Sequence, residues 1–411
     1  MAGAMAGAAY GGEAAFHNPA LLADASWGGV SLGATGSHFG LDVALQRPVC
    51  TASYSSCRAQ YDTWFSSRAA RQPPTSGGFQ LSWHAPLGGA LHKRVVIGAL
   101  MALPSSRLIH ISGPDAQTPH FYMYEGLPDR ISVALAASWQ PLDWLSVGLG
   151  TQVLAALSSE VQLDMDVTNH DTDMAAVRIE LQPVARLTAG LALRPGRGLR
   201  LGVGYRQEIS LRYEIPSQID LGESARADLM VEQNTLFSPS SVHFGGSWRS
   251  PSSTWLVALD LGLALWSSAP DPSTQVQIDV GGETVDKAGL GEVIDVGQDA
   301  APIDVRFADT WTPAIAVQWR PLTAVALRSG YAFRPSPAPR ASGPFNYLDN
   351  DAHMLGFGAE WGFGQAITSR PVGRGNLDEP LRVDHPLSLR FGGQWLILAR
   401  RTVHKLDDND P

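Results

Sequence analysis

Cysteine, charge and long apolar runs are all scarce in this chain of 411 residues. Charged residues make up 17% of it and the formal net charge is −9. Clustered Lys and Arg suited to phosphate contacts are absent, which argues against a nucleic-acid-binding surface. No stretch of about 18 apolar residues occurs, so a transmembrane helix is excluded. A transmembrane strand needs only about 9–11 residues of alternating polarity, so a membrane protein built from strands remains open.

The two cysteines, Cys50 and Cys57, lie close together in a polar segment. Their spacing fits either a disulfide that closes a small ring in an oxidising compartment or two free surface thiols. The chain opens with MAGAMAGAAYGGEAAF, which lacks the basic and long apolar regions of a secretory signal. A membrane location would therefore imply a mature or truncated chain, or one with a misassigned start.

Residue patterns typical of catalysis or metal binding are missing as well. The segment Gly29-Val-Ser31-Leu-Gly33 matches the nucleophile-elbow pattern, but no helix is expected after it, which favours a chance match. The 11 histidines are scattered without metal-ligand spacing. A solvated charge run is a better interpretation than an ion site for the acidic loop residues Asp164, Asp166, Asp171 and Asp173. We therefore predict no catalytic residue, no metal site and no cofactor.

What the chain does contain is alternation of apolar and polar residues with a period of two. Between Leu199 and Tyr213 every odd position but one is apolar or aromatic, and the even positions are small or charged. Trp255–Leu265 alternates in the same way. Further alternating segments lie at 131–139, 145–153, 177–193, 315–319, 325–333, 355–363 and 387–397. This pattern predicts an all-β fold with many antiparallel strands.

Two further features favour a membrane barrel over a soluble sandwich. The polar face mixes Gly and Ala with charged residues such as Arg206, Glu208 and Arg328, which suits a lumen filled by a plug or water. Short turns alternate with long polar connections, at 46–76, 104–128, 158–174, 267–310 and 335–350. Tryptophans flank the short turns, as an aromatic belt at a membrane boundary would: Trp139, Trp144, Trp248, Trp255 and Trp319.

Several segments together resemble the FadL/TodX family of outer-membrane transporters of long-chain fatty acids and hydrocarbons. GAAYGGEAAFHNPALLA, at Gly7–Ala23, resembles the family's hatch signature, in which a Gly/Ala-rich stretch runs into Asn-Pro-Ala. Segments that resemble the family's strand motifs lie at Leu199–Glu208, Trp255–Ser267, Asp309–Ala332 and Asp349–Glu360. Each motif alone is weak, but together they cover nearly the whole chain in the right order.

The resemblance implies a transmembrane antiparallel β-barrel of 14 strands with an N-terminal hatch that plugs the lumen. It implies hatch roles for Asn18, Pro19 and Ala20. Pro19 fixes its own φ and biases Asn18 away from the helical region, a bend that a plug or an ordinary turn would use equally well. The family's lateral gap lies beside its third strand, for which Arg94–Leu103 is the candidate, with Gly98 permitting the kink. We expect a hatch at 1–25, a barrel at 26–400 and a polar tail or loop at 401–411.

The number of strands departs from this expectation. We count about 13 strands, the last at His385–Arg400, whereas single-chain bacterial barrels have an even number. An open edge in lipid would leave backbone groups unsatisfied. Either the closing strand is missing from the chain, or two strands are merged in 216–250, where Pro216 and Pro239 interrupt the pattern.

The function implied by the resemblance is passive uptake of long-chain fatty acids or other hydrophobic small molecules across the outer membrane, with lateral exit. The protein would be a monomer in contact with lipopolysaccharide and outer-membrane lipids. A general porin for small hydrophilic solutes is the alternative, and a barrel enzyme is a third. The hatch-like N-terminus favours the transporter over the porin, and the absence of catalytic spacing disfavours the enzyme. The head group of a fatty acid would need a basic residue near the loop end, and the sequence does not choose among Arg94, Arg107 and Arg130.

Overall fold

The computed structural model describes residues 1–41, 75–88, 94–105, 121–124, 131–166, 171–220, 226–270, 275–281, 305–340, 347–369 and 382–402. Cys50, Cys57, Arg107 and Arg130 lie outside the described residues. Among the described residues, no helix is both long and apolar enough to cross a membrane.

Antiparallel strands in chain order form one curved wall, in which each strand pairs with the next. The wall comprises β1 (Gly29–Ser37), β2 (Ser76–Pro86), β3 (Val95–Pro104), β4 (Ser132–Leu142), β5 (Leu145–Asp166), β6 (Asp171–Gly196), β7 (Leu199–Arg206), β10 (Ser241–Arg249), β11 (Trp255–Ala264), β13 (Thr310–Leu322), β14 (Val325–Arg334), β15 (Ala352–Phe363) and β18 (Leu387–Leu398). These 13 strands agree with the count made from the sequence. Because every pairing along the path is antiparallel, β1 and β18 run in the same direction. The described pairings include none between these two strands.

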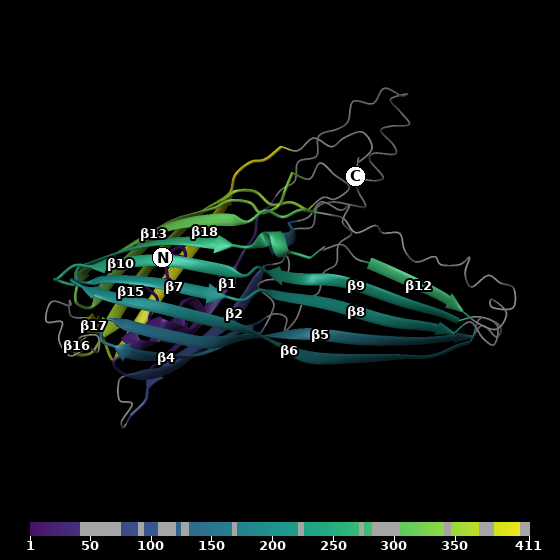
Figure 1. Ribbon diagram of the computed structural model, residues 1–411, viewed down its shortest axis with the longest axis horizontal. Helices are drawn as coiled ribbons and strands as arrows, with labels where there is room; N and C mark the ends of the chain where they lie inside the picture. Colours follow the sequence, from purple (N-terminus) through teal and green to yellow (C-terminus); the bar gives the residue numbers. More distant parts are fainter. Residues whose placement is uncertain are drawn as a thin grey trace.

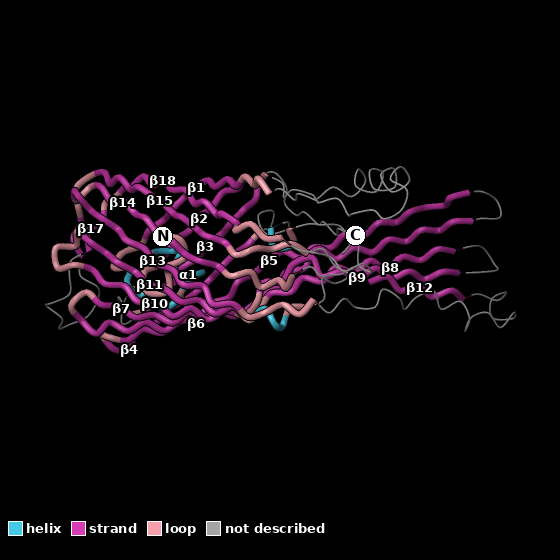
Figure 2. Tube along the Cα trace, turned by 90° about the horizontal axis from the view of Figure 1, so that it is seen from above, coloured by secondary structure: helices cyan, strands magenta, loops and turns pink. Residues whose placement is uncertain are grey.

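Three strands leave the wall and extend the sheet beyond it. These are β8 (Ile209–Asp220), β9 (Arg226–Ser238) and β12 (Gln275–Gly281), of which β9 pairs with both others and β8 pairs in parallel with the far part of β5. Figures 1 and 2 show them beside the long ends of β5 and β6, at the opposite end of the molecule from the short turns. The polar connection predicted at 158–174 is therefore wrong in part, because it forms the outer part of the β5–β6 hairpin.

The single alternating run from Leu199 to Tyr213 is two strands, which is a second correction. At the break, Gln207 Oε1 accepts a hydrogen bond from the Leu187 amide at 3.1 Å, and the Glu208 amide donates to Ser240 Oγ at 3.0 Å. Side chains thus take over backbone partners, and the chain leaves the wall there. The interpretation that 216–250 contains more than one strand is confirmed, since β9 ends before Pro239 and β10 follows it. Because β9 lies off the wall, the number of wall strands is unchanged.

The two faces of the wall differ as the alternation predicts. On β4, β7 and β11 the outward positions carry exposed side chains, for example Leu135, Leu201 and Leu259, whereas the residues between them are buried and small or polar. All five tryptophans near the short turns are exposed on the outward face, between 42% and 53%. Rings of Trp255 and Trp319 stack with centroids 5.9 Å apart. The outward face therefore carries large apolar side chains, and the inward face carries small or polar side chains that are buried.

The N-terminal segment packs against the inward face. It folds into η1 (Gly11–Glu13), α1 (Ala14–His17) and η2 (Pro19–Asp24), which lie among the strands in Figure 2. Its Ala14, Ala15, Leu21 and Leu22 are almost completely buried and share a core cluster with wall residues such as Val96. The remaining short elements are η4 (Tyr122–Tyr124), η5 (Trp266–Ser268) and a hairpin of β16 (Ile367–Ser369) with β17 (Arg382–Asp384), which precedes β18.

Candidate functional site: the contact between the N-terminal segment and the wall

Asn18 holds the centre of the N-terminal segment in place. Its side chain is 0% exposed, and its Oδ1 accepts from the Ala20 amide at 3.1 Å, which caps η2. Its Nδ2 donates to the carbonyl of Ala6 at 2.8 Å and to that of Leu191 in β6 at 3.2 Å. An amide side chain is suited to this position because it offers an acceptor and two donors at once. Pro19 follows as the first residue of η2, where its missing N–H costs nothing.

Wall glycines make this close contact possible. A Cβ atom added to Gly190 in β6 would overlap Asn18 Oδ1, and one added to Gly148 in β5 would overlap the backbone of Pro19. One added to Gly202 in β7 would overlap the carbonyl of Ala6. The glycines among the inward polar residues are therefore explained by the approach of the segment's backbone rather than by an open water-filled lumen. Alternation in the sequence places Gly202 on this face, but it does not predict which segment approaches it.

A buried ionic group ties the end of η2 to the same strands. Asp24 accepts from Arg194 Nε at 2.8 Å, and its other oxygen lies 3.1 Å from Arg200 Nη1. Ser146 Oγ donates to the carbonyl of Ala20 at 2.9 Å and accepts from Arg194 Nη2 at 3.2 Å. Burial alone would raise the pKa of Asp24, but the guanidinium groups of Arg194 and Arg200 lower it to about 2. The carboxylate is thus charged at neutral pH and holds the segment electrostatically.

The start of the segment is fixed to β10 and β11, which continue the wall from β7. The Ala6 amide donates to Asp260 Oδ2 of β11 at 2.8 Å, and Ser247 Oγ of β10 donates to the carbonyl of Gly7 at 2.6 Å. Between these two anchored regions, the guanidinium of Arg206 lies 4.3 Å from the centroid of Phe16. Burial and the positive charge of Arg206 lower the pKa of His17 to about 3, so this imidazole is neutral near pH 7.

Gly98 lies in β3, the third strand, as expected, but the strand is paired on both sides there, and Arg94 lies at the opposite end of the wall from the loops. Gly98 pairs with His84 of β2 and with Ala136 of β4 in continuous registers, so the wall is closed on both sides of it. A Cβ at Gly98 would overlap Leu22 Cδ2, so this glycine too serves close packing of the segment. Arg94 was considered near the loop end but precedes β3 at the short-turn end, where its Nη1 donates to the carbonyl of Pro141 at 3.0 Å.

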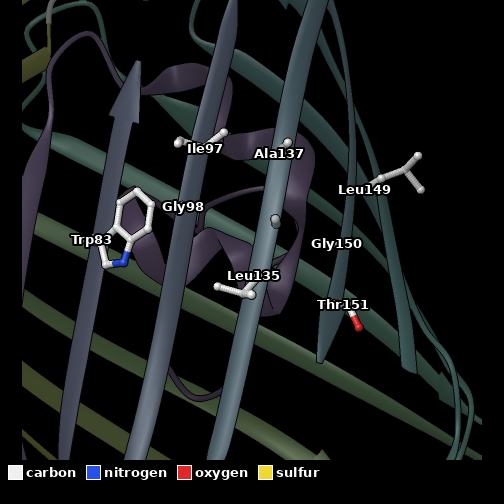
Figure 3. A pocket seen from close by; sticks show the side chains of 9 residues that line it. Trp83, Ile97, Gly98, Leu135, Ala137, Leu149, Gly150 and Thr151 are labelled. Carbon is white, nitrogen blue, oxygen red and sulfur yellow. The ribbon is translucent and has the colours of Figure 1, made fainter. Parts of the chain in front are cut away.

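Shallow apolar hollows lie on the outward face of the wall. Figure 3 shows one of about 450 Å³ between β2 and β5, with Trp83, Ile97, Leu135 and Leu149 around it. Leu135 and Leu149 are 45% and 62% exposed, so this hollow opens outward rather than into the interior. Two similar hollows of about 670 and 590 Å³ lie over β13–β18 and over β6–β13. The residues that line all three hollows are mostly apolar.

A separate, mainly aromatic core cluster lies at the end opposite the short turns. The cluster consists of Phe237, Trp266, Val305, Phe307, Ala338 and Tyr347. Next to it, Arg334 Nη2 donates to Asp349 Oδ1 at 2.8 Å. Burial raises the pKa of the Asp349 carboxyl, although Arg334 opposes this shift. In the described part of the chain, no group of three or more His, Cys, Asp or Glu side chains is arranged to hold a metal ion.

Comparisons with known proteins yield similar folds only among solved structures. No protein-family model matches the chain, and no curated protein matches it. A FadL homologue from Pseudomonas aeruginosa superposes with a TM-score of 0.47 at 12% identity, over 94% of this chain and 92% of that one. The CymD monoaromatic hydrocarbon channel gives 0.44 at 12% identity, over 93% and 88%. The Pseudomonas putida toluene transporter TodX gives 0.44 at 18% identity, over 88% of each chain.

Proposed function

We propose that this protein is an outer-membrane channel for passive uptake of hydrophobic small molecules, plugged by its N-terminal segment. The observation that carries the proposal is the inverted surface of the wall. Large apolar side chains are exposed along its outward face, from Leu135 on β4 to Phe391 on β18, while charged and small residues face inward. An apolar surface that continues around so many strands would be unfavourable in water, whereas lipid tails would solvate it.

The aromatic residues support the same orientation. Exposed tryptophans gather near the short turns, where amphipathic rings would lie at a membrane–water boundary. Short turns at one end and long extensions at the other are typical of outer-membrane barrels, whose short turns face the periplasm. We therefore assign the short-turn end to the periplasmic side and β8, β9 and β12 to the outside of the cell.

The filled interior favours this function over that of a general porin. A porin needs a continuous water path, whereas here Ala14, Ala15, Leu21 and Leu22 occupy the interior with almost no exposure. Hydrophobic cargo would gain about 0.8 kcal/mol for each methylene group that it buries along an apolar route. Long-chain fatty acids or hydrocarbons are the proposed cargo, in line with the family resemblance.

Lateral exit beside β3 is the proposed route out of the wall. In the conformation described, β3 is paired along both edges at Gly98. Exit there therefore requires β3 to separate locally from β2 or β4, and the packing of Leu22 against Gly98 couples that separation to the N-terminal segment.

Transport by the purified protein in liposomes tests the proposal. We expect saturable entry of fluorescent oleate into liposomes that retain a small hydrophilic dye. The same measurement on Asn18→Ala, which loosens the N-terminal segment, should add dye leakage to oleate entry. Gln394→Ala is a matched control, because Gln394 is an exposed amide on β18. Free passage of the dye through the unmodified protein, without saturable oleate entry, would contradict the proposal and establish a general pore.

A further inference from the structure

A group of arginine side chains gathers inside the wall at the short-turn end: Arg194, Arg200, Arg249, Arg320 and Arg382. Strand alternation explains why they face inward. Arg249 ends β10 two residues after the buried Ser247, and Arg320 follows the buried Gln318 on β13 by the same step. Arg200 is level with Ser247 in the β7–β10 register, so it is a close neighbour of Arg249.

The carboxylates near this group already have cationic partners. Asp24 is shared by Arg194 and Arg200. Asp384 lies 3.1 Å from Arg382 Nε, and the same guanidinium covers the ring of Tyr10. Glu360 pairs with Arg328 and Arg390. Among the described residues, these three carboxylates therefore already have cationic partners, and neither Arg249 nor Arg320 is one of those partners.

Arg249 has no such partner among the described residues. It is only 9% exposed, and its Nε is buried without a hydrogen-bond acceptor. It lies within electrostatic reach of Arg200, Arg320 and Arg382, all of which repel it, and of Asp384, which attracts it. Arg320 Nη1 donates to the carbonyl of Thr323 at 2.8 Å, and among the described residues this is its one side-chain hydrogen bond, so its other N–H groups can donate to a ligand. A buried guanidinium whose Nε has no hydrogen-bond acceptor and whose neighbours are mostly cations is costly, which points to a ligand there.

We propose that Arg249, together with Arg320 and Arg200, binds an oxyanion, a carboxylate or phosphate group, at the short-turn end of the interior. The planar guanidinium donates two parallel N–H groups, which match the paired oxygens of these groups. The site lies at the opposite end from the aromatic cluster of the loops. A ligand bound there would also offset the repulsion among the three arginines.

Calorimetric titration of the full chain in detergent tests this site without any transport step. The probes are inorganic phosphate, decanoate and decanol, each titrated into the unmodified protein, Arg249→Gln and Arg320→Gln. Arg197→Gln is the matched control, because Arg197 is an exposed arginine in the turn between β6 and β7 at the same end. Thermal unfolding of each variant establishes that it is folded.

We expect at least a tenfold loss of anion affinity in Arg249→Gln, a smaller loss in Arg320→Gln and no change in Arg197→Gln. Loss for both phosphate and decanoate would identify a general oxyanion site, and loss for decanoate alone would identify the head group of an apolar ligand. Decanol binding should be the same in all variants. The proposal is overturned if neither anion binds the unmodified protein, or if folded Arg249→Gln binds both as tightly. Neither result would bear on transport, which the liposome measurement tests separately.

Discussion

Replacement of Asn18 by alanine should loosen the N-terminal segment more than any other single change at its centre. The substitution removes the cap of η2, a loss of about 1 kcal/mol. It also leaves the buried carbonyl of Ala6 without its donor, which costs about 1–3 kcal/mol. The total is about 2–4 kcal/mol, so the displaced state of the segment should become at least about 30-fold more populated.

Hydrogen exchange measured by mass spectrometry on peptides covering residues 6–24 reports this population directly. In Asn18→Ala these peptides should exchange at least about 30-fold faster, while peptides from β13 and β14 keep their rates. Asn18→Ser should fall between, because a hydroxyl still caps η2 but cannot reach both carbonyls. Gln394→Ala should exchange like the unmodified protein. Unchanged exchange of residues 6–24 in a folded Asn18→Ala protein would refute the role assigned to this side chain.

Four further predictions concern the same contact. Asp24→Asn leaves Arg194 and Arg200 without a counter-charge and should destabilise the segment by about 3 kcal/mol in thermal unfolding, with Arg197→Gln as the unchanged control. Since the pKa of Asp24 is lowered from 3.8 to about 2, its ionised carboxylate stabilises the packed segment fully above pH 4. This stabilisation should be lost as the pH falls through 2, which hydrogen exchange of the segment would detect. The pKa of His17 is lowered from 6.5 to about 3, so His17 takes up a proton more readily when the segment is released than when it is packed. The packed state of the segment should therefore be destabilised below pH 6.5, by about 2 kcal/mol at pH 5. His17→Gln should remove this pH dependence of hydrogen exchange. Gly190→Ala should cost about 1–3 kcal/mol through overlap with Asn18 and cause dye leakage, whereas Gly33→Ala, which meets no atom within 4 Å, should do neither.

The wall could be predicted from the sequence because its signal is local. Period-2 alternation assigns each residue to a face without knowledge of its partners, and the exposed Leu201 and Leu259 and the buried Arg200 and Asp260 follow it. The break between β7 and β8 escaped prediction for the opposite reason. It depends on Gln207 and Glu208 meeting Leu187 and Ser240, which are distant in sequence.

The contact site was predictable only in part. Asn18, Pro19 and Ala20 were found through a family resemblance, and the structure places all three in a buried turn of the segment. Their partners were not found, since Ser146 is 126 positions from Ala20 and Arg194 is 170 positions from Asp24. A glycine on an inward strand position indicates that something approaches closely, but alternation alone does not say what.

The contacts that fix the N-terminal segment predict how the proposed hydrophobic cargo passes the wall. Release of the whole segment would break the Asp24 ion pairs, the Asn18 contacts and the bonds of Ala6 and Gly7 together. The Asp24 ion pairs contribute about 3 kcal/mol, the Asn18 contacts about 2 kcal/mol, and the hydrogen bonds of Ala6 and Gly7 about 1 kcal/mol each. The cost of release is then about 7 kcal/mol, so the segment would be released in roughly one molecule in 10⁵. Passage should instead use local movement between the anchors, around Gly11–His17.

A cross-link decides between these two modes of passage. A Cβ at Gly356 would lie 3.5 Å from that of Ala2, within the range of a disulfide, so Ala2→Cys with Gly356→Cys can fix the start of the segment to β15. With Cys50 and Cys57 replaced by serine, the oxidised protein should keep at least half of its oleate entry, since the middle of the segment stays free. Loss of entry on oxidation, restored by a reductant, would mean that the segment leaves the wall as a unit and that its anchors are weaker than their geometry indicates.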